Sequence, residues 1–364
     1  MLKKSKKNVA VEADKLETLN EIDVAKALRE HGIEFHQFTK PNRTIIPFGI
    51  RHVDQDILGT GGVVSGVFTN IWGPKGSGKS ALIYTLIASA QKVKPNHIVA
   101  LYDSEYSYNE IFAMMAGVDP TRLHVIQNNS AVAVLPELEK FARSGACSLI
   151  VLDSVANLIT KAQEESQKIP GDFAREIKAW MLRFVKYIHA TDTAGVGTNQ
   201  VTEVIGQMFG DNKDYPGGQA YKHNTQMSIR LSFFEWVGED GKKVVPGEDT
   251  AGMRIKINVD KNKFAPLRKT DESNHPIIWW ENHAEKHIAV SLIDDGIRAG
   301  FVQPSGHWYT LIDPATGAQI DKYNGRKNFE AALVNDDEGI RQRVEEWLWS
   351  GITANVPPQP TEES

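Results

Sequence analysis

The sequence predicts an α/β protein built on a mainly parallel, twisted sheet, and three observations lead to this class. Between about residues 44 and 283, short apolar runs alternate with segments of helical periodicity, as in sheets that helices cover on both faces. A glycine-rich phosphate-binding sequence separates one such run from the helical segment after it. Apolar residues are 41% of the 364 residues, which excludes a disordered chain and a disulfide-stapled mini-domain.

Changes in composition divide the chain into four predicted parts. Residues 1–43 begin with a basic stretch and form a small helix–strand module. Residues 44–283 form the core, and residues 284–350 form a small α+β domain. The polar, proline-containing residues 351–364 are expected to be a disordered tail.

Periodicity places the elements in order. The N-terminal module is expected to contain a helix at 14–30 and an extended segment at 33–38. The core strands are expected at 67–72, 98–102, 123–126, 149–152, 195–200, 227–231, 253–259 and 277–280. The core helices are expected at 80–92, 132–144 and 173–189. In the C-terminal domain, helices at 288–299 and 336–349 are expected to flank a strand at 308–312.

The apolar runs, the cysteine content and the net charge limit the cellular location and the partners that we expect. No apolar run of about 18 residues is present, so we expect no transmembrane helix and no membrane partner. The basic N-terminus has no apolar segment after it, which argues against a signal peptide. The single cysteine, Cys147, fits a reducing cytoplasm, where we expect the protein to act. A net charge of −5 argues against coating nucleic acid through overall charge alone.

The most specific motif matches G-x-x-x-x-G-K-[ST], with an apolar run before it and a helical segment after it. Its glycines let successive N–H groups point at phosphate oxygens, and the helix that follows presents its positive end to the same anion. Lys79 is expected to reach the β- and γ-phosphates, and the Ser80 hydroxyl to bind Mg²⁺. The expected phosphate-binding residues are Gly73, Pro74, Lys75, Gly76, Ser77, Gly78, Lys79 and Ser80.

Carboxylates follow two of the predicted strands. Asp153 ends the apolar run 149–152 and is expected to join the magnesium shell beside the phosphate loop. Asp103 and Glu105 follow the run 98–102, and one of them is expected to orient the water that attacks the γ-phosphate. Glu105 has the longer reach. Guanine specificity is disfavoured, because residues 260–263 read DKNK rather than N-K-x-D.

At these residues the chain resembles the RecA family of recombinases, including UvsX-like phage recombinases. The segments IWGPKGSGKSALIYTLIASAQ, LYDSEYSYNEIFAMMAGVD, SLIVLDSVANL, TNQVTEVIGQMFG, PGGQAYK and DKNKFAPL follow the family's order over residues 55–270. The resemblance implies a RecA-like P-loop ATPase core that uses ATP and Mg²⁺. It also implies helical filaments of the chain on single-stranded DNA, pairing with homologous duplex DNA, and strand exchange in recombination and repair.

The resemblance assigns roles residue by residue. It implies that Glu105 is the catalytic glutamate and that Asp153 belongs to the magnesium shell. Phe112 falls at the position of a ring that stacks on adenine, although helix packing explains a phenylalanine there equally well. Gln200 matches a glutamine that senses the γ-phosphate. Lys261 and Lys263 resemble paired lysines that reach a neighbouring subunit's ATP, where added positive charge would stabilise the transferred phosphoryl group.

Two loops are implied to face the DNA, at about 161–173 and 201–216. Arg175 aligns with a DNA-contacting arginine near the first loop. In the second loop, apolar side chains are expected to wedge between bases while glycines give mobility. The residues expected to contact DNA there are Ile205, Gly206, Met208, Phe209 and Gly210. The second loop departs from the family because it is acidic, with Lys213 as its only basic residue.

The resemblance also implies that the 1–43 module serves oligomerisation, with the segment 33–38 adding to a sheet edge of the adjacent subunit. A single-strand-binding or loader protein is a further expected partner. Two other classes stay open: a ring helicase, which would usually need an arginine finger, and a nucleotide-switched DNA-binding protein that does not hydrolyse ATP. The sequence leaves phage or cellular origin open.

Overall fold

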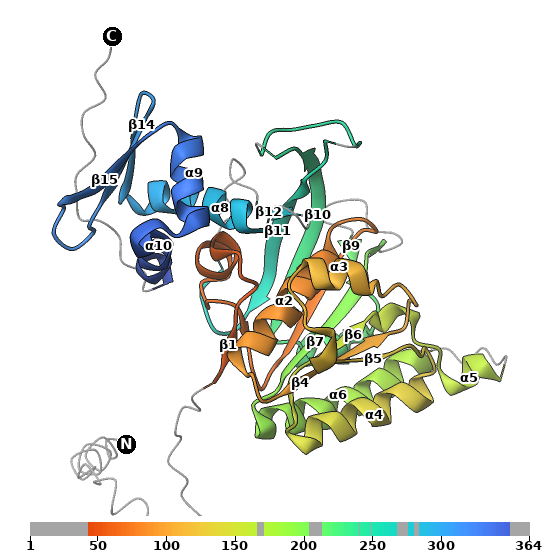
Figure 1. Cartoon of the computed structure of the whole chain (residues 1–364). Helices are drawn as coiled ribbons and strands as arrows, with labels where there is room; N and C mark the ends of the chain where they lie inside the picture. The colour runs from red at the N-terminus through yellow and green to blue at the C-terminus, as the bar shows by residue number, and fades with distance from the viewer. Residues whose placement is uncertain are drawn as a thin grey trace, which may run out of the picture. The chain divides into compact units, whose positions relative to one another are not determined.

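The computed structural model describes residues 43–165, 171–203, 213–239, 241–247, 249–267, 276–279 and 284–349 (Figure 1). Contacts divide the chain into two units, Met1–Asn42 and Arg43–Ser364, and all described residues belong to the second. The expected N-terminal helix, the segment 33–38 and the tail therefore lie outside the described residues. The predicted domain boundaries stay predictions.

An eight-stranded sheet forms the centre of the core. Its order is β12 (Ile277–Trp279), β11 (Gly252–Asn262), β10 (Met227–Val237), β3 (Phe68–Gly73), β7 (Ala194–Gln200), β6 (Cys147–Asp153), β4 (Ile98–Asp103) and β5 (Leu123–Ile126). The strands from β10 to β5 are parallel to one another; β11 runs antiparallel to β10, and β12 runs antiparallel to β11. The predicted mainly parallel sheet is confirmed.

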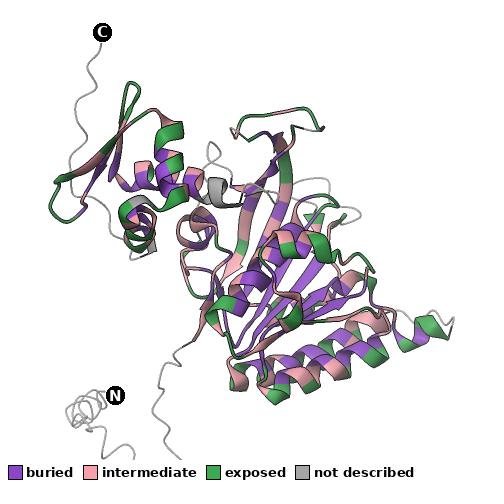
Figure 2. Ribbon diagram, viewed as in Figure 1, coloured by how far each residue is buried: buried purple, intermediate pink, exposed green. Residues whose placement is uncertain are grey.

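The strands of this sheet are largely buried (Figure 2), and successive residues belong to core clusters on opposite faces of the sheet. On β4, Val99 and Leu101 pack in the core cluster of helix α2 (Lys79–Val93), and Ala100 and Tyr102 pack in the opposite cluster. Helices α4 (Ala131–Ser144) and α6 (Asp172–Thr191) contribute to that second cluster and lie side by side. Because helices cover both faces, all seven residues of β6 are buried, which explains its continuous apolar sequence.

Shorter elements connect these layers. In the core they are β1 (Ile45–Ile46), the π-helix η2 (His52–Ile57), β2 (Val63–Val64), α3 (Glu110–Met115), η3 (Pro120–Arg122), η4 (Val155–Asn157), α5 (Lys161–Glu164), β8 (Thr202–Glu203), β9 (Lys213–Asp214) and α7 (Gly218–Asn224). Helices α3 and α7 were not expected. Helix α7 begins at Gly218, a residue type that disfavours helix.

The C-terminal part has its own apolar core, which includes Phe301 and Phe329. Its elements are α8 (Ala284–Ala299), β13 (Val302–Ser305), β14 (Trp308–Ile312), β15 (Gln319–Asn324), α9 (Arg326–Asn335), η6 (Asp337–Gly339) and α10 (Ile340–Trp349). The expected single helix at 336–349 is wrong, because Asp336 and Glu338 have positive φ angles and α10 begins only at Ile340. The expected α+β class agrees with these elements.

No helix among the described residues is both long and apolar enough to cross a membrane.

Asp192 joins four segments that lie far apart in the sequence. Its carboxylate accepts hydrogen bonds from the Thr44 hydroxyl at 2.6 Å, from the Lys94 ammonium at 2.8 Å and from the Ser65 hydroxyl. Partial burial alone would raise the pKa of Asp192, but the hydrogen bonds from Lys94, Ser65 and Thr44 outweigh it and lower that pKa to about 2.

We expect Asp192→Asn to lower the free energy of unfolding by about 1 kcal/mol at pH 7, because the side chain is 37% exposed and solvent screens part of the charge. The folded pKa lies below the unfolded value, so the contribution is present above pH 4 and disappears as pH falls towards 2. Urea denaturation at pH 7 and pH 3 measures it, with the exposed Asp249→Asn as control. An equal loss at both pH values would contradict this account.

Candidate functional site

The phosphate loop lies between β3 and α2, as the motif predicts. Gly76 and Gly78 have φ angles of 74° and 90°, in the left-handed region that favours glycine. A Cβ atom at Gly73 would lie 2.2 Å from the carbonyl oxygen of Leu231, so this position admits only glycine without a backbone shift. The loop therefore needs its glycines for backbone geometry.

The Lys79 ammonium folds back over this loop. Its Nζ donates hydrogen bonds to the carbonyl oxygens of Gly73 and Pro74, each at 2.9 Å. Burial lowers the pKa of Lys79, while the nearby Asp153 and Glu105 carboxylates act in the opposite direction. The ammonium thus lies between the phosphate loop and the two predicted carboxylates.

Asp153 ends β6 and is almost fully buried. One carboxylate oxygen accepts a hydrogen bond from the Thr198 hydroxyl of the neighbouring strand β7. Burial raises the pKa of Asp153 to about 6; the Thr198 hydrogen bond opposes this, and the Glu105 charge adds to it. A cation is therefore the natural partner for this carboxylate, and Ser80 provides an exposed hydroxyl at the start of α2.

Glu105 receives two hydrogen bonds on the same oxygen. Its Oε1 accepts from the Ser154 hydroxyl at 2.7 Å and from the Gln200 amide at 3.1 Å. Ser154 follows β6, and Gln200 ends β7, so the sheet edge brings three chain segments together. The predicted residues Glu105 and Gln200 are thus in direct contact, and Ser154, which no sequence pattern indicated, contacts the same oxygen.

The structure distinguishes Asp103 from Glu105. Asp103 is buried, and its carboxylate accepts hydrogen bonds from the backbone N–H groups of Glu105 at 3.2 Å and Tyr108 at 2.8 Å, and from the Gln127 amide at 3.0 Å. These bonds shape the loop that carries Glu105. Asp103 is therefore occupied with loop structure, and Glu105 is the carboxylate that can orient water.

Phe112 lies on α3, whose first turn Asn109 caps through its side chain. The ring is partly buried and meets Tyr84 edge to face, with ring centroids 6.0 Å apart. Adenine stacking on Phe112 stays a prediction, because this packing gives the ring a structural role as well.

The predicted DNA loops are described only at their ends. Ile205, Gly206, Met208, Phe209 and Gly210 lie outside the described residues. Arg175 is 65% exposed on α6, 3.6 Å from Asp172, and lines a groove of about 490 Å³ between α6 and α7. Lys178 lines the same groove. Lys178 was not predicted, although its position three residues after Arg175 places both side chains on one helix face.

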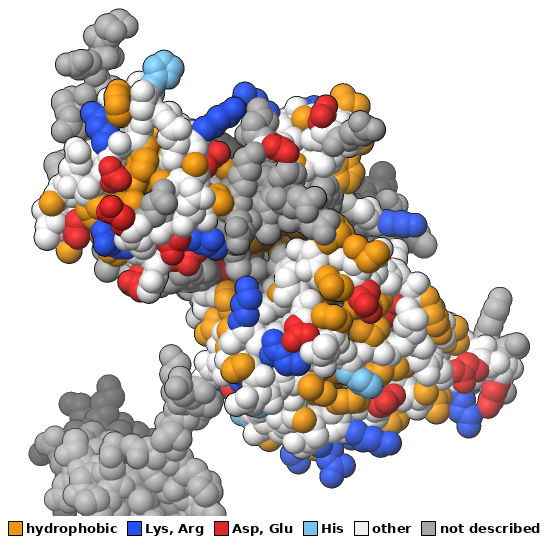
Figure 3. Space-filling view, viewed as in Figure 1, with side chains coloured by type: hydrophobic (Ala, Val, Ile, Leu, Met, Phe, Trp, Pro, Cys, Tyr) orange, Lys and Arg blue, Asp and Glu red, His pale blue; other side chains and the backbone are white. Residues whose placement is uncertain are grey.

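Charged groups do not form one uniform surface. On the face shown in Figure 3, basic and acidic side chains are interspersed with hydrophobic ones, in keeping with the net charge of −5. With this net charge, a local cluster of cations is the kind of surface that would bind a polyanion, and Arg175 and Lys178 form one in the α6–α7 groove.

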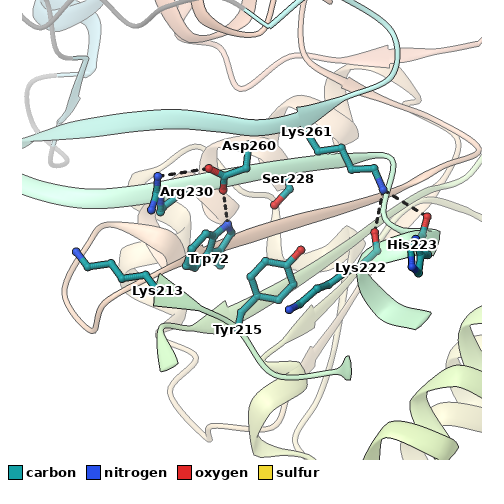
Figure 4. A pocket seen from close by; sticks show the side chains of 9 residues that line it. All are labelled: Trp72, Lys213, Tyr215, Lys222, His223, Ser228, Arg230, Asp260 and Lys261. Atoms are coloured by element: carbon teal, nitrogen blue, oxygen red, sulfur yellow. Dashed lines mark hydrogen bonds and ion pairs between the residues drawn. The ribbon is translucent and has the colours of Figure 1, made fainter. Parts of the chain in front are cut away.

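The two lysines of the predicted pair lie in different environments in the structure. Lys261 lines a polar cavity of about 420 Å³, where its Nζ donates to the carbonyl oxygen of Lys222 at 2.9 Å (Figure 4). Burial lowers the pKa of Lys261, and the charge of Lys263 adds to this effect. Lys263 is exposed and does not line the cavity. The cavity-lining residues are Trp72, Lys213, Tyr215, Lys222, His223, Ser228, Arg230, Asp260 and Lys261.

A phosphate loop on a parallel sheet, with carboxylates at the adjacent strand ends, defines a P-loop nucleotide-binding protein. The family model for the RecA N-terminal domain matches residues 32–280. Protein RecA of Thermus aquaticus is 32% identical over 281 residues, which cover 76% of this chain and 78% of the relative. Protein RecA of Chlorobaculum tepidum is 33% identical over 303 residues, 82% of each chain. The chain belongs to the RecA family.

Proposed function

We propose that this protein is an ATP-dependent recombinase that assembles as a helical filament on single-stranded DNA and exchanges strands with a homologous duplex. The observation that carries the proposal is the hydrogen bond between Glu105 and Gln200. Gln200 directly precedes the second predicted DNA loop, so one hydrogen bond links the candidate hydrolytic carboxylate to the residue from which that loop begins. This arrangement suits a protein in which DNA binding controls ATP hydrolysis.

The residues present fit ATP and Mg²⁺. The phosphate loop and Lys79 would hold the triphosphate, and the oxygens of Ser80 and Asp153 are hard ligands of the kind that Mg²⁺ prefers alongside phosphate oxygens. The bound ion would neutralise charge on the phosphates. Glu105 would orient and deprotonate the attacking water, and Gln200 would exchange its bond to Glu105 for one to the γ-phosphate.

Lys261 and Lys263 are proposed to act on the nucleotide of an adjacent copy. Hydrolysis would then require assembly, because each site would be completed by its neighbour. We further propose a single-strand-binding or loader protein as a partner in assembly, by class only.

ATP turnover with and without single-stranded DNA, combined with negative-stain imaging at a stated salt concentration, tests the proposal. We expect DNA to raise turnover and filaments to appear with ATP and DNA together. A chain that binds ATP without turnover would indicate the nucleotide-switched alternative. Closed rings that translocate on DNA would indicate the helicase.

Arg175→Ala is expected to weaken single-stranded DNA binding and to reduce the slope of log affinity against log salt by roughly 0.7, because one phosphate contact is lost. Lys178→Ala is expected to act in the same way, since both cations line one groove. Fluorescence anisotropy across a salt series measures the slope. Lys140→Ala, at an exposed position on α4, is the matched control. Unchanged slopes for both groove variants would contradict this placement.

A further inference from the structure

The Lys261 cavity carries an excess of positive charge. Lys213, Lys222, Arg230 and Lys261 line it, and Asp260 is the single carboxylate among its lining residues. Asp214, outside the lining, pairs with Lys222 at 2.5 Å, so four cations face two carboxylates. The lining includes no residue of the phosphate loop 73–80, so it is distinct from the chain's own triphosphate site. Several cations around a cavity of about 420 Å³ suit a compact polyanion.

A β-bulge explains why Lys261 points into this cavity. Ser228 of β10 lies opposite Lys261 of β11, but the next residue, Ile229, lies opposite Val259, so Asp260 is an extra residue in β11. Ile229 is fully buried in the sheet core. Without the bulge, strict alternation would turn Lys261 to the core face, so the bulge brings Asp260 and Lys261 to the same side as Ser228.

Arg230 reaches the same cavity from β10, two residues after Ser228 and therefore on the same face. Its guanidinium lies 5.2 Å from the centre of the Trp72 ring and 3.5 Å from the Asp260 carboxylate (Figure 4). The Trp72 indole N–H also donates to Asp260 at 2.9 Å, so Arg230 shares that carboxylate.

The Arg230–Asp260 pair is partly exposed, with 22% and 32% of the two side chains accessible. An ion pair of this exposure contributes little to stability, so a stronger anion can replace it. A phosphate group can accept two parallel hydrogen bonds from the planar guanidinium, which makes an arginine suited to a phosphate ligand.

We propose that Arg230 is a further catalytic residue, which acts beside Lys261 on the triphosphate held by the phosphate loop of an adjacent copy. This inference rests on the proposed function. A triphosphate concentrates several charges in a short length that the cavity can accept, whereas a DNA backbone spreads its charges along a groove.

Mixing two inactive variants tests this role. Arg230→Ala keeps an intact phosphate loop but lacks the arginine, and we expect about a 100-fold loss of DNA-stimulated ATP turnover. Lys79→Ala keeps Arg230 but lacks the loop lysine. In a 1:1 mixture, about a quarter of the interfaces pair an intact loop with an intact arginine, so we expect turnover of roughly a quarter of the unmodified protein's value.

Two further mixtures separate the inference from the proposed function. Lys261→Ala with Lys79→Ala is expected to recover turnover in the same way. Arg230→Ala with Lys261→Ala is expected to stay inactive, because each variant lacks part of what it must give its neighbour. If only the Lys261 mixture recovers, the role of Arg230 is overturned. If neither mixture recovers, the proposed action of one copy on another fails as well.

Arg230→Lys guards against a folding defect, since it keeps the charge and most of the chain length. We expect it to retain more turnover than Arg230→Ala while its thermal midpoint matches that of the unmodified protein. A fall in the salt dependence of DNA binding in Arg230→Ala, without recovery in the mixture, would assign Arg230 to DNA and overturn the proposal.

Discussion

Glu105→Gln is expected to lower ATP turnover by a factor of roughly 10² to 10⁴, because an amide cannot accept the proton of the attacking water. The glutamine keeps the size of the side chain and an oxygen that still accepts hydrogen bonds from Ser154 and Gln200. We therefore expect ATP binding and assembly on DNA to persist. Steady-state phosphate release measures the loss, and nucleotide binding is followed by equilibrium titration.

Glu110→Gln provides the control for this substitution. Glu110 is exposed in the first turn of α3, five residues after Glu105, so it has the same chemistry outside the site. Its turnover should match that of the unmodified protein. Turnover of Glu105→Gln within about threefold of the unmodified protein would reject Glu105 as the base, since general bases contribute far more than that.

Phe68→Ala is expected to lower the free energy of unfolding by about 3–5 kcal/mol. Phe68 is 1% exposed at the start of β3, and its ring meets Trp180, Phe184 and Tyr221 edge to face, with centroids 5.5–6.1 Å apart. Truncation leaves a cavity between the sheet, α6 and α7. Denaturant titration followed by tryptophan fluorescence measures the change.

The matched control is Phe234→Ala, because Phe234 is 52% exposed on β10. Its loss should be well below 1 kcal/mol. Since α6 and α7 also form the groove of Arg175, Phe68→Ala should weaken DNA binding as well as stability. A loss of unfolding free energy for Phe68→Ala as small as that for Phe234→Ala would show that the ring cluster contributes little to stability.

The sequence predicted the sheet and the phosphate loop because both depend on neighbouring residues. Continuous apolar runs such as Cys147–Asp153 indicate buried parallel strands, and the loop is a contiguous motif. Asp153 was found because a strand end is visible in sequence. Glu105 was preferred to Asp103 only for its reach and for the family resemblance, because the hydrogen bond from Gln127 to Asp103 joins residues 24 positions apart and cannot be read from the sequence.

Other features depend on register and packing and leave no local trace. Arg230 shares a cavity with Lys261 through strand pairing and a bulge, which no periodicity reveals. Ser154 reaches Glu105 only because β6 and β4 are neighbours. Helix α9 was missed, and Asp336 at its end takes a left-handed conformation that its residue type only weakly indicates.

Through its hydrogen bond to Glu105, Gln200 lies between the proposed catalytic carboxylate and the predicted second DNA loop, which begins at residue 201. A change in the backbone at residue 201, where the predicted second loop begins, would move Gln200 and so alter its hydrogen bond to Glu105. A movement of this loop on binding single-stranded DNA would thus reach the proposed catalytic site through one residue, Gln200. The rate of ATP hydrolysis and the affinity of the filament for single-stranded DNA would then change together. A variant that alters one of these quantities should therefore also alter the other.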